Sequence, residues 1–307
     1  MEADLIHWLR KQLPPDPRLL LGIGDDAAVL QLVEPAQCVV TSDLLMDGTD
    51  FVLRECDPRR AGRKALAVNL SDLAAMAAKP VAAIVSLALP KSCALSLARE
   101  LYHGILPLAK QYDTIIAGGD TNTWDGPLAI SITAIGEVTD TPPLRRNGAR
   151  SGDIVIVTGK LGGSILGKHF DFTPRVNEAL RLTRAYEIHA ATDISDGLSL
   201  DLANITSESG CGAVLDLASV PIAEAAHRLA EQTTQSPIDH ALSDGEDFEL
   251  ILSVPPTEAE RLCADRPLDI PLTAIGTYIE EPGLWYEDMQ GGRVSLPPRG
   301  YRHEGHA

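Results

Sequence analysis

Short apolar runs alternate with segments of helical periodicity along the chain, and this alternation constrains the fold more than any other feature. The runs at 29–32, 38–41, 51–53, 81–89, 113–117 and 128–138 are apolar or β-branched and are punctuated by Gly and Asp, which predicts strands. A helix is expected from Pro58 to Met76 after an Asp57 cap, and a second helix after a Ser92 cap. The pattern predicts a first α/β unit.

A second series of elements follows the stretch 139–150, which is rich in Pro, Gly and Arg and is the best linker candidate. Strands are expected near 154–157, 213–217, 248–254 and 272–277, and helices near 175–187, 198–209 and 257–265. Gly210 should end the helix at 198–209, and residues 293–307 should be irregular. We therefore predict an α/β (α+β) protein with two α/β domains, residues 1–142 and 143–307.

Composition excludes several classes of function. The 307 residues include 26 basic and 43 acidic side chains, a formal net charge of −17, so there is no sequence-wide basic footprint for nucleic acid. The most apolar stretch, 65–89, is interrupted by Asp72, Lys79 and Pro80, which argues against a membrane span. The five cysteines are scattered without a C-x-x-C pair, so neither a disulfide framework nor a structural zinc site is expected. We expect a cytoplasmic protein with no signal peptide.

Five short turns carry aspartate, and most of them follow an apolar run: 24–26, 41–43, 69–72, 118–120 and 193–197. A single aspartate in a turn is usually an Asx-turn or a helix cap. Carboxylates that gather within a few ångströms repel one another unless a cation neutralises them, and oxygen ligands suit Mg²⁺, which also bridges to phosphates. If the turns converge, an acidic chain can bind a polyanion through metal ions.

Two glycine motifs resemble nucleotide-binding loops without satisfying their requirements. Gly22-x-Gly24 begins like a dinucleotide fingerprint, but Asp25 and Asp26 would repel a pyrophosphate. Residues 162–168 fit G-x-x-x-x-G-K, yet His169 occupies the place of the Mg²⁺-binding Ser or Thr. We interpret these glycines as a strand-to-helix turn, which leaves open a position near phosphate.

Six segments, taken in order, strongly resemble the thiamine-monophosphate kinase family: LGIGDDAAVL (21–30), TSDLLMDGTDF (41–51), KALAVNLSDLAAMAAKP (64–80), AGGDT (117–121), TDISDGL (192–198) and SDGEDFEL (243–250). That family belongs to an ATP-binding superfamily that includes aminoimidazole ribonucleotide synthetase. The resemblance implies two α/β domains, the first pairing across a homodimer and the second covering an ATP site with several Mg²⁺ ions. It also implies transfer of the γ-phosphoryl group of ATP to thiamine monophosphate, which gives thiamine diphosphate.

The same resemblance implies roles for individual residues. The implied metal ligands are Asp26, Thr41, Ser42, Asp43, Asp72, Asp120, Asp193 and Asp196. The implied ATP contacts are Tyr102, Gly119, Asp120, Arg146 and Ser195. The implied substrate contacts are Asp50, Glu246 and Pro298, of which Asp50 replaces the usual His of the family and Pro298 replaces its usual aromatic residue.

The implied reaction needs no catalytic base or nucleophile from the protein, because the accepting phosphate oxygen is already ionised at neutral pH. Catalysis then consists of alignment and charge neutralisation, which favours direct in-line transfer. Two alternatives stay open from the residues alone. One is another ATP-dependent enzyme of the superfamily with a different acceptor, and the other is a nucleotide-binding protein without turnover.

Overall fold

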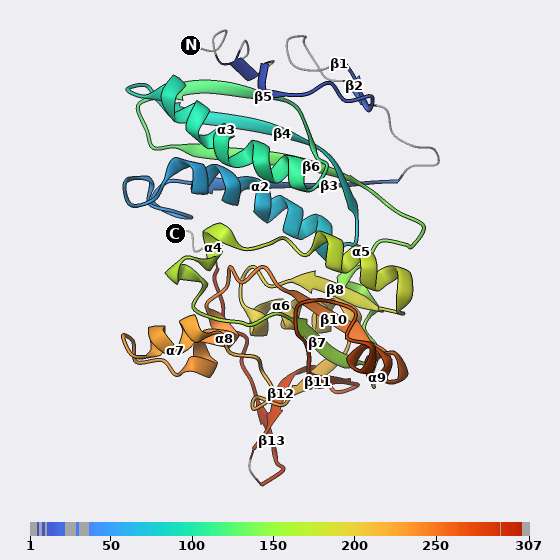
Figure 1. Ribbon diagram of the computed structural model, residues 1–307. Helices are drawn as coiled ribbons and strands as arrows, with labels where there is room; N and C mark the ends of the chain where they lie inside the picture. Colours follow the sequence, from blue (N-terminus) through green and yellow to red (C-terminus); the bar gives the residue numbers. More distant parts are fainter. Residues whose placement is uncertain are drawn as a thin grey trace. The chain divides into compact units, whose positions relative to one another are not determined.

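The computed structural model describes Leu5, Trp8 and Leu9 together with residues 11–21, 29–30, 37–288 and 290–302. The chain forms two compact units, each with its own sheet (Figure 1). Unit 1 comprises Met1–Leu73 with Ala78–Asp140, and unit 2 comprises Ala74–Ala77 with Thr141–Ala307. The predicted mixed α/β fold is confirmed. Across the described ranges, the helices are all too short or too polar to cross a bilayer.

Unit 1 contains a four-stranded sheet in the order β3 (Cys38–Met46), β6 (Ala129–Glu137), β4 (Lys79–Pro90) and β5 (Ile115–Trp124). A separate pair joins β1 (Leu19–Leu21) and β2 (Val29–Leu30). Strands β4 and β5 run parallel, so they need a crossover, which α3 (Ala94–Gln111) provides. The other helix, α2 (Pro58–Ala75), lies beside α3 in Figure 1, and a short 3₁₀ turn, η1 (Leu53–Glu55), precedes it.

Helix α2 packs against one face of the unit 1 sheet, whereas large apolar side chains on the other face are exposed. On one face, a Cβ on Gly136 would stand 3.1 Å from the Leu73 side chain of α2, so helix and sheet are in close contact there. Side chains alternate along β3, so Val39 and Leu45 are buried while Val40 and Leu44 are 61% and 58% exposed. We call the second face the open face. Thr41 and Asp43 share the covered face, and Ser42 lies on the open face.

Unit 2 contains a seven-stranded sheet, antiparallel except where β12 meets β9. Its order is β13 (Arg293–Ser295), β12 (Gly283–Glu287), β9 (Gly212–Leu215), β11 (Leu272–Ile279), β7 (Ile154–Thr158), β10 (Leu250–Val254) and β8 (Ala190–Asp193). The helices are α4 (Lys168–Asp171), α5 (Val176–Ala185), α6 (Leu198–Ser209), α7 (Glu224–Ala230), α8 (Pro237–Ser243) and α9 (Pro256–Asp265), with 3₁₀ turns η2 (Arg146–Gly148) and η3 (Ser164–Leu166). Buried residues of α6 pack with those of the sheet in one apolar core.

Three local expectations are wrong. Residues 51–53 form no strand, because the Asp47 and Asp50 carboxylates accept hydrogen bonds from the Leu53 and Met46 N–H groups and hold the segment in a turn. The cap residue of α3 is Cys93 rather than Ser92, and it makes no side-chain cap bond. Residues 293–295 form β13, whose exposed side chains carry no burial pattern that a sequence could reveal.

Candidate active site

An acidic group lies on the covered face of the unit 1 sheet. Thr41 on β3 donates a short hydrogen bond to the Asp72 carboxylate on α2. The Asp43 Oδ2 atom is buried and has no hydrogen-bond partner among the described residues. Burial, followed by the charges of the nearby Asp72 and Asp50 carboxylates, raises the pKa of Asp43 to about 7. A buried carboxylate without compensation is costly, so its presence marks a candidate functional site.

These oxygen donors fit part of a Mg²⁺ site. Thr41, Asp43 and Asp72 supply the hard ligands that Mg²⁺ prefers, and a cation would compensate the unpartnered Asp43 oxygen. Asp26, a further predicted ligand, lies outside the described residues. Within the described ranges, no three His, Cys, Asp or Glu side chains converge into a complete metal site. The donor set is therefore partial in the described part of one chain.

Asp50 is held beside this group by the turn that follows β3. Its carboxylate accepts a hydrogen bond from the Met46 N–H at 2.7 Å, and its carbonyl accepts one from the Lys64 ammonium at 2.8 Å. Lys64 is fully buried. The predicted substrate residue Asp50 thus caps its own turn and also adds negative charge near Asp43.

The structure places the other predicted residues of unit 1 elsewhere. Ser42 lies on the open face, with its Oγ 3.0 Å from Thr133 Oγ1. Gly119 and the exposed Asp120 lie on β5, at the opposite edge of the sheet from β3, which is three strand spacings or roughly 14 Å away. Tyr102 is 3% exposed and packs edge-to-face against Trp8. One copy of unit 1 does not bring these side chains to Asp43.

In unit 2, predicted residues gather where β8 ends and α6 begins. Asp193 is the last residue of β8, and Ser195 and Asp196 lie in the turn that follows. Arg146, in η2, donates from Nε to Thr192 on β8 at 3.2 Å. The Ser195 carbonyl accepts a hydrogen bond from the Glu246 N–H at 2.7 Å.

The segment that contains Pro298 is fixed at the same turn. The Tyr301 N–H donates to the Asp196 carbonyl at 2.9 Å, and Ser199 exchanges two hydrogen bonds with the Arg299 backbone at 2.8 and 2.9 Å. Pro298 itself is exposed. The unit 2 turn therefore brings together the predicted metal, ATP and substrate residues of this half of the chain.

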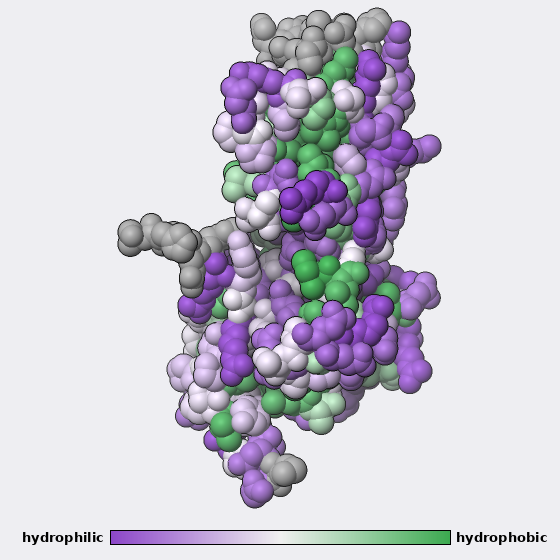
Figure 2. Space-filling view, turned by 90° about the vertical axis from the view of Figure 1, so that its left-hand side faces the viewer, coloured by the Kyte–Doolittle hydropathy of each residue, from purple (hydrophilic) through white to green (hydrophobic). Residues whose placement is uncertain are grey.

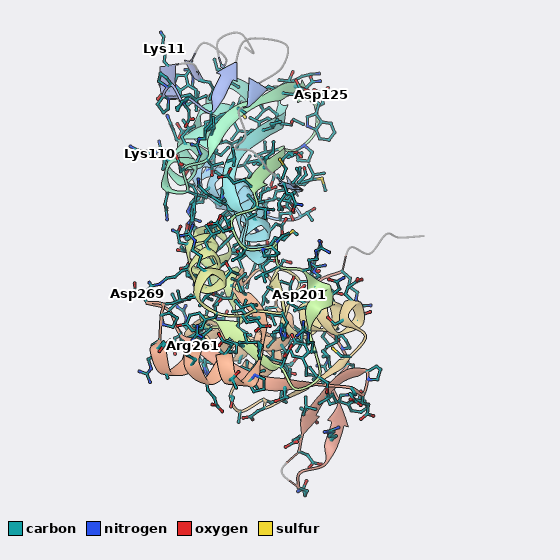
Figure 3. The ribbon with its side chains drawn as sticks, turned by 90° about the vertical axis from the view of Figure 1, so that its right-hand side faces the viewer. Lys11, Lys110, Asp125, Asp201, Arg261 and Asp269 are labelled. Atoms are coloured by element: carbon teal, nitrogen blue, oxygen red, sulfur yellow. The ribbon has the colours of Figure 1, made fainter. Side chains whose placement is uncertain are left out.

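Asp201 on α6 is a residue of this site that sequence reasoning missed. It lies in unit 2 (Figure 3). It is 1% exposed, and its Oδ2 accepts hydrogen bonds from the Asp196 and Gly197 N–H groups at 3.0 Å each. Burial, followed by the Asp196 charge, raises the pKa of Asp201 to about 7. Its spacing four residues after Gly197, in the first turn of a helix, is the signal that could have identified it.

The acids of the SDGEDFEL segment divide into structural residues and one outward residue. Glu249 receives two bonds from Arg175 at 2.7 Å each, one from Lys168 at 3.0 Å and one from Thr158 at 2.8 Å. Burial opposes ionisation, yet these donors hold the pKa of Glu249 below its usual range. By contrast, Glu246 keeps a third of its side chain exposed.

Acids of the same SDGEDFEL segment also bond the glycine motif at 162–168. Asp247 accepts hydrogen bonds from the Gly162 N–H at 2.8 and 3.0 Å, and Asp244 accepts one from the Gly163 N–H at 2.8 Å. The motif lysine, Lys168, is engaged by Glu249. Two N–H groups of the motif and its lysine are therefore engaged by the chain's own carboxylates. The glycines lie between β7 and η3, which confirms the strand-to-helix interpretation.

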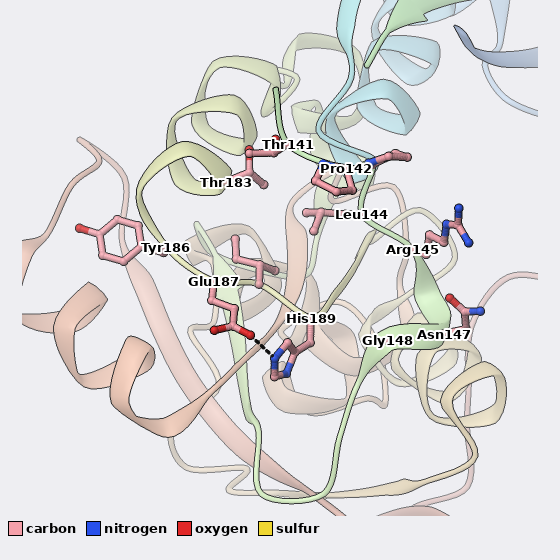
Figure 4. A pocket seen from close by; sticks show the side chains of 12 residues that line it. Thr141, Pro142, Leu144, Arg145, Asn147, Gly148, Thr183, Tyr186, Glu187 and His189 are labelled. Carbon is pink, nitrogen blue, oxygen red and sulfur yellow. Dashed lines mark hydrogen bonds and ion pairs between the residues drawn. The ribbon is translucent and has the colours of Figure 1, made fainter. Parts of the chain in front are cut away.

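A separate cavity of about 390 Å³ lies in unit 2 between residues 141–148 and 183–189 (Figure 4). None of the predicted site residues lines it. Both ring nitrogens of His189 at its wall are engaged, Nδ1 by Asp153 at 2.8 Å and Nε2 by Glu187 at 2.9 Å. This cavity offers no reacting group.

Comparison with known proteins identifies the family of the chain. Residues 24–138 match the AIR synthase related protein, N-terminal domain, and residues 150–285 match the corresponding C-terminal domain. The thiamine-monophosphate kinase of Rhodopirellula baltica is 44% identical over 99% of this chain and 97% of its own, and that of Escherichia coli K12 is 35% identical over 92% and 91%. The crystal structure of thiamine-monophosphate kinase from Stenotrophomonas maltophilia K279a covers 92% of this chain and 94% of its own, with a TM-score of 0.79 and 36% identity. AaThiL complexed with AMPPCP and TMP covers 99% and 97%, with a TM-score of 0.78 and 29% identity.

The fold and the two domain matches place the chain in the AIR synthase related class of proteins. Escherichia coli HypE shares this fold at a TM-score of 0.79 and only 18% identity. Within the class, the chain belongs to the thiamine-monophosphate kinase family.

Asp43 gives the first prediction. Its pKa is higher in the folded chain than the ordinary 3.8, so between about pH 4 and pH 7 the folded state holds a proton that the unfolded chain has lost. The free energy of unfolding should therefore fall as pH rises through this window. In EDTA, wild type should lose about 2 kcal/mol relative to Asp43→Asn between pH 5 and pH 8, measured by urea unfolding.

Mg²⁺ at pH 8 should restore the stability of wild type but not that of Asp43→Asn. Asp140→Asn, at an exposed position of the same unit, is the matched control and should follow wild type. Parallel pH profiles for wild type and Asp43→Asn would contradict the assignment of Asp43 as an uncompensated carboxylate.

Proposed function

We propose that this enzyme transfers the γ-phosphoryl group of ATP to thiamine monophosphate and so forms thiamine diphosphate. The observation that carries the proposal is the similarity over nearly the whole chain to the Rhodopirellula baltica thiamine-monophosphate kinase. The AaThiL complex with AMPPCP and TMP supports ATP and thiamine monophosphate as the two ligands. The acidic group of unit 1 and the β8–α6 turn of unit 2 supply side chains suited to that chemistry.

Thr41, Asp43 and Asp72 would hold Mg²⁺ in unit 1, and Asp193 and Asp196 would do so in unit 2. Bound Mg²⁺ supplies charge neutralisation on the transferring phosphates. Arg146 and Ser195 offer a guanidinium and a hydroxyl to the nucleotide, and Asp201 fixes the turn that carries Ser195. The Glu246 carboxylate suits the cationic thiazolium of thiamine monophosphate. Because the accepting phosphate oxygen is ionised, in-line transfer requires orientation rather than a base.

Product analysis tests the function directly. Wild type incubated with ATP, Mg²⁺ and thiamine monophosphate should yield thiamine diphosphate by mass spectrometry, and excess EDTA should abolish the product. Asp43→Asn should lower kcat more than 100-fold, about 3 kcal/mol of transition-state stabilisation, because it removes a ligand charge. Asp140→Asn serves as control. ATP turnover without thiamine diphosphate would move the assignment to a different acceptor.

Asp50 gives a separate prediction about the substrate. A carboxylate beside Asp43 repels a substrate phosphate, so Asp50→Asn should lower the KM for thiamine monophosphate about threefold to tenfold and change kcat less. The amide oxygen can still accept the Met46 N–H, so the turn is kept. Asp47→Asn removes a charge from the same turn and is the matched control. Equal KM values in wild type and Asp50→Asn would reject this role of Asp50.

We also propose that the enzyme is a homodimer joined through unit 1. On the open face Val40, Leu44, Met46, Ile84 and Trp124 are 37% to 61% exposed, an apolar surface that suits a second copy. The space-filling view shows hydrophobic residues between hydrophilic ones on unit 1 (Figure 2). Both edge strands, β3 and β5, have unpaired edges in the described sheet. A second copy with its β5 beside β3 would bring the strand that carries its Asp120 next to the strand that carries Thr41 and Asp43.

A mixing experiment tests this arrangement. If Asp43 and Asp120 of one site come from different copies, a heterodimer of Asp43→Asn and Asp120→Asn chains contains one intact site. Re-associating the two inactive variants should then restore up to about a quarter of wild-type activity, because half of the dimers are mixed and each has one good site. No recovery after verified subunit exchange would place both residues in one copy.

We further propose a cytoplasmic location, in keeping with five unpaired cysteines.

A further inference from the structure

Two neighbouring residues of α4 contact two acids of the SDGEDFEL segment. Lys168 Nζ lies 3.0 Å from Glu249 Oε1, and His169 Nδ1 lies 3.3 Å from Glu246 Oε2. These residues end the glycine motif that superficially resembles a phosphate loop. The lysine contact secures a fully structural acid. The histidine contact reaches the one acid of the segment that is turned outward.

Hydrogen bonds hold the backbone of Glu246 in one conformation, but the orientation of its carboxylate depends on a side-chain contact. Glu246 has φ +52°, in the left-handed region, and its N–H is bonded to Ser195. On either side, the Gly245 carbonyl accepts from Ser164 Oγ at 2.7 Å and Asp247 is bonded to Gly162. A glutamate side chain has three rotatable bonds, so a fixed backbone alone does not aim its carboxylate.

His169 is suited to aim that carboxylate. Its side chain is only 6% exposed, and its ring lies 4.1 Å from the Phe170 ring between centroids. Position and orientation are therefore set by packing, and a preorganised partner loses little conformational freedom when it forms a contact. The imidazole is too buried to be the main substrate surface, whereas the Glu246 side chain is a third exposed.

We propose that His169 is a positioning residue that directs the Glu246 carboxylate towards the cationic ring of thiamine monophosphate and so sets the affinity for this substrate. The proposal rests on the proposed function. In this proposal the His169 imidazole affects substrate binding indirectly, through the Glu246 carboxylate. Neither the glycine motif nor the predicted metal ligands account for a histidine at this position.

Steady-state kinetics of a double-mutant cycle tests it. His169→Phe keeps an aromatic ring against Phe170 and removes the nitrogen; it should raise the KM for thiamine monophosphate about tenfold, with kcat and the KM for ATP within about twofold. His169→Asn, whose amide nitrogen can occupy the place of Nδ1, should recover most of the loss. In a Glu246→Gln background, His169→Phe should change the KM less than twofold, because the partner charge is already gone.

His103→Phe, at an exposed position, is the matched control. Additive effects of His169→Phe and Glu246→Gln, equal rises in both KM values, or no recovery in His169→Asn would overturn the proposal. Wild type that forms no thiamine diphosphate would reject the proposed function instead. In that case crystal structures of wild type and His169→Phe decide the positioning role: a redirected Glu246 carboxylate supports it, and an unchanged one overturns it.

Discussion

A carboxylate that leaves water must be compensated, and unit 2 is organised around this requirement. Glu249 is neutralised by Arg175 and Lys168, while both oxygens of Asp247 accept hydrogen bonds from the Gly162 N–H. These contacts join the glycine turn, α4 and the segment that leads into β10. The loop between them is thereby held in a single conformation. Within the SDGEDFEL segment the Glu246 side chain is a third exposed, and the Glu246 N–H links this framework to the Ser195 carbonyl of the β8–α6 turn.

Unit 1 shows the opposite arrangement of charge. Asp43 has a buried oxygen that no described group compensates, and Asp72 and Asp50 add further negative charge beside it. Lys64, a fully buried cation of the same unit, donates a hydrogen bond to the Asp50 carbonyl. Acids that accept internal hydrogen bonds, such as Glu249, therefore help to build the fold of unit 2, whereas the Asp43 oxygen of unit 1 has no donor among the described residues and would suit a cation. Acidic residues therefore have two roles in this protein. Where internal donors surround the carboxylate it stabilises the fold, and where donors are missing it is suited to bind a cation.

The sequence predicted the fold class and most elements because apolar periodicity is a local signal. Helix α6 and its end at Gly210 agree with expectation, and α2 and α9 agree within a residue. The failures have causes that apolar periodicity does not record. Asp47 and Asp50 capture backbone N–H groups and replace the strand expected at 51–53, and β13 shows no burial pattern. In the candidate site, motif resemblance pointed to Glu246, and the local spacing to Gly197 could have identified Asp201. The roles of Glu249 and His169, in contrast, depend on partners distant in sequence. Nothing in the local pattern separates the buried Glu249 from the partly exposed Glu246.

The left-handed backbone at Glu246 and Phe248 has a consequence for protein engineering and for evolution. Non-glycine residues at φ +52° and φ +50° carry strain that glycine would relieve. Selection for stability would therefore favour glycine at position 246. That substitution would relieve the backbone strain but remove the outward carboxylate. Glutamate at this position therefore costs some folding stability and keeps the carboxylate. Any thermostabilised descendant of this protein should have that position held constant during selection.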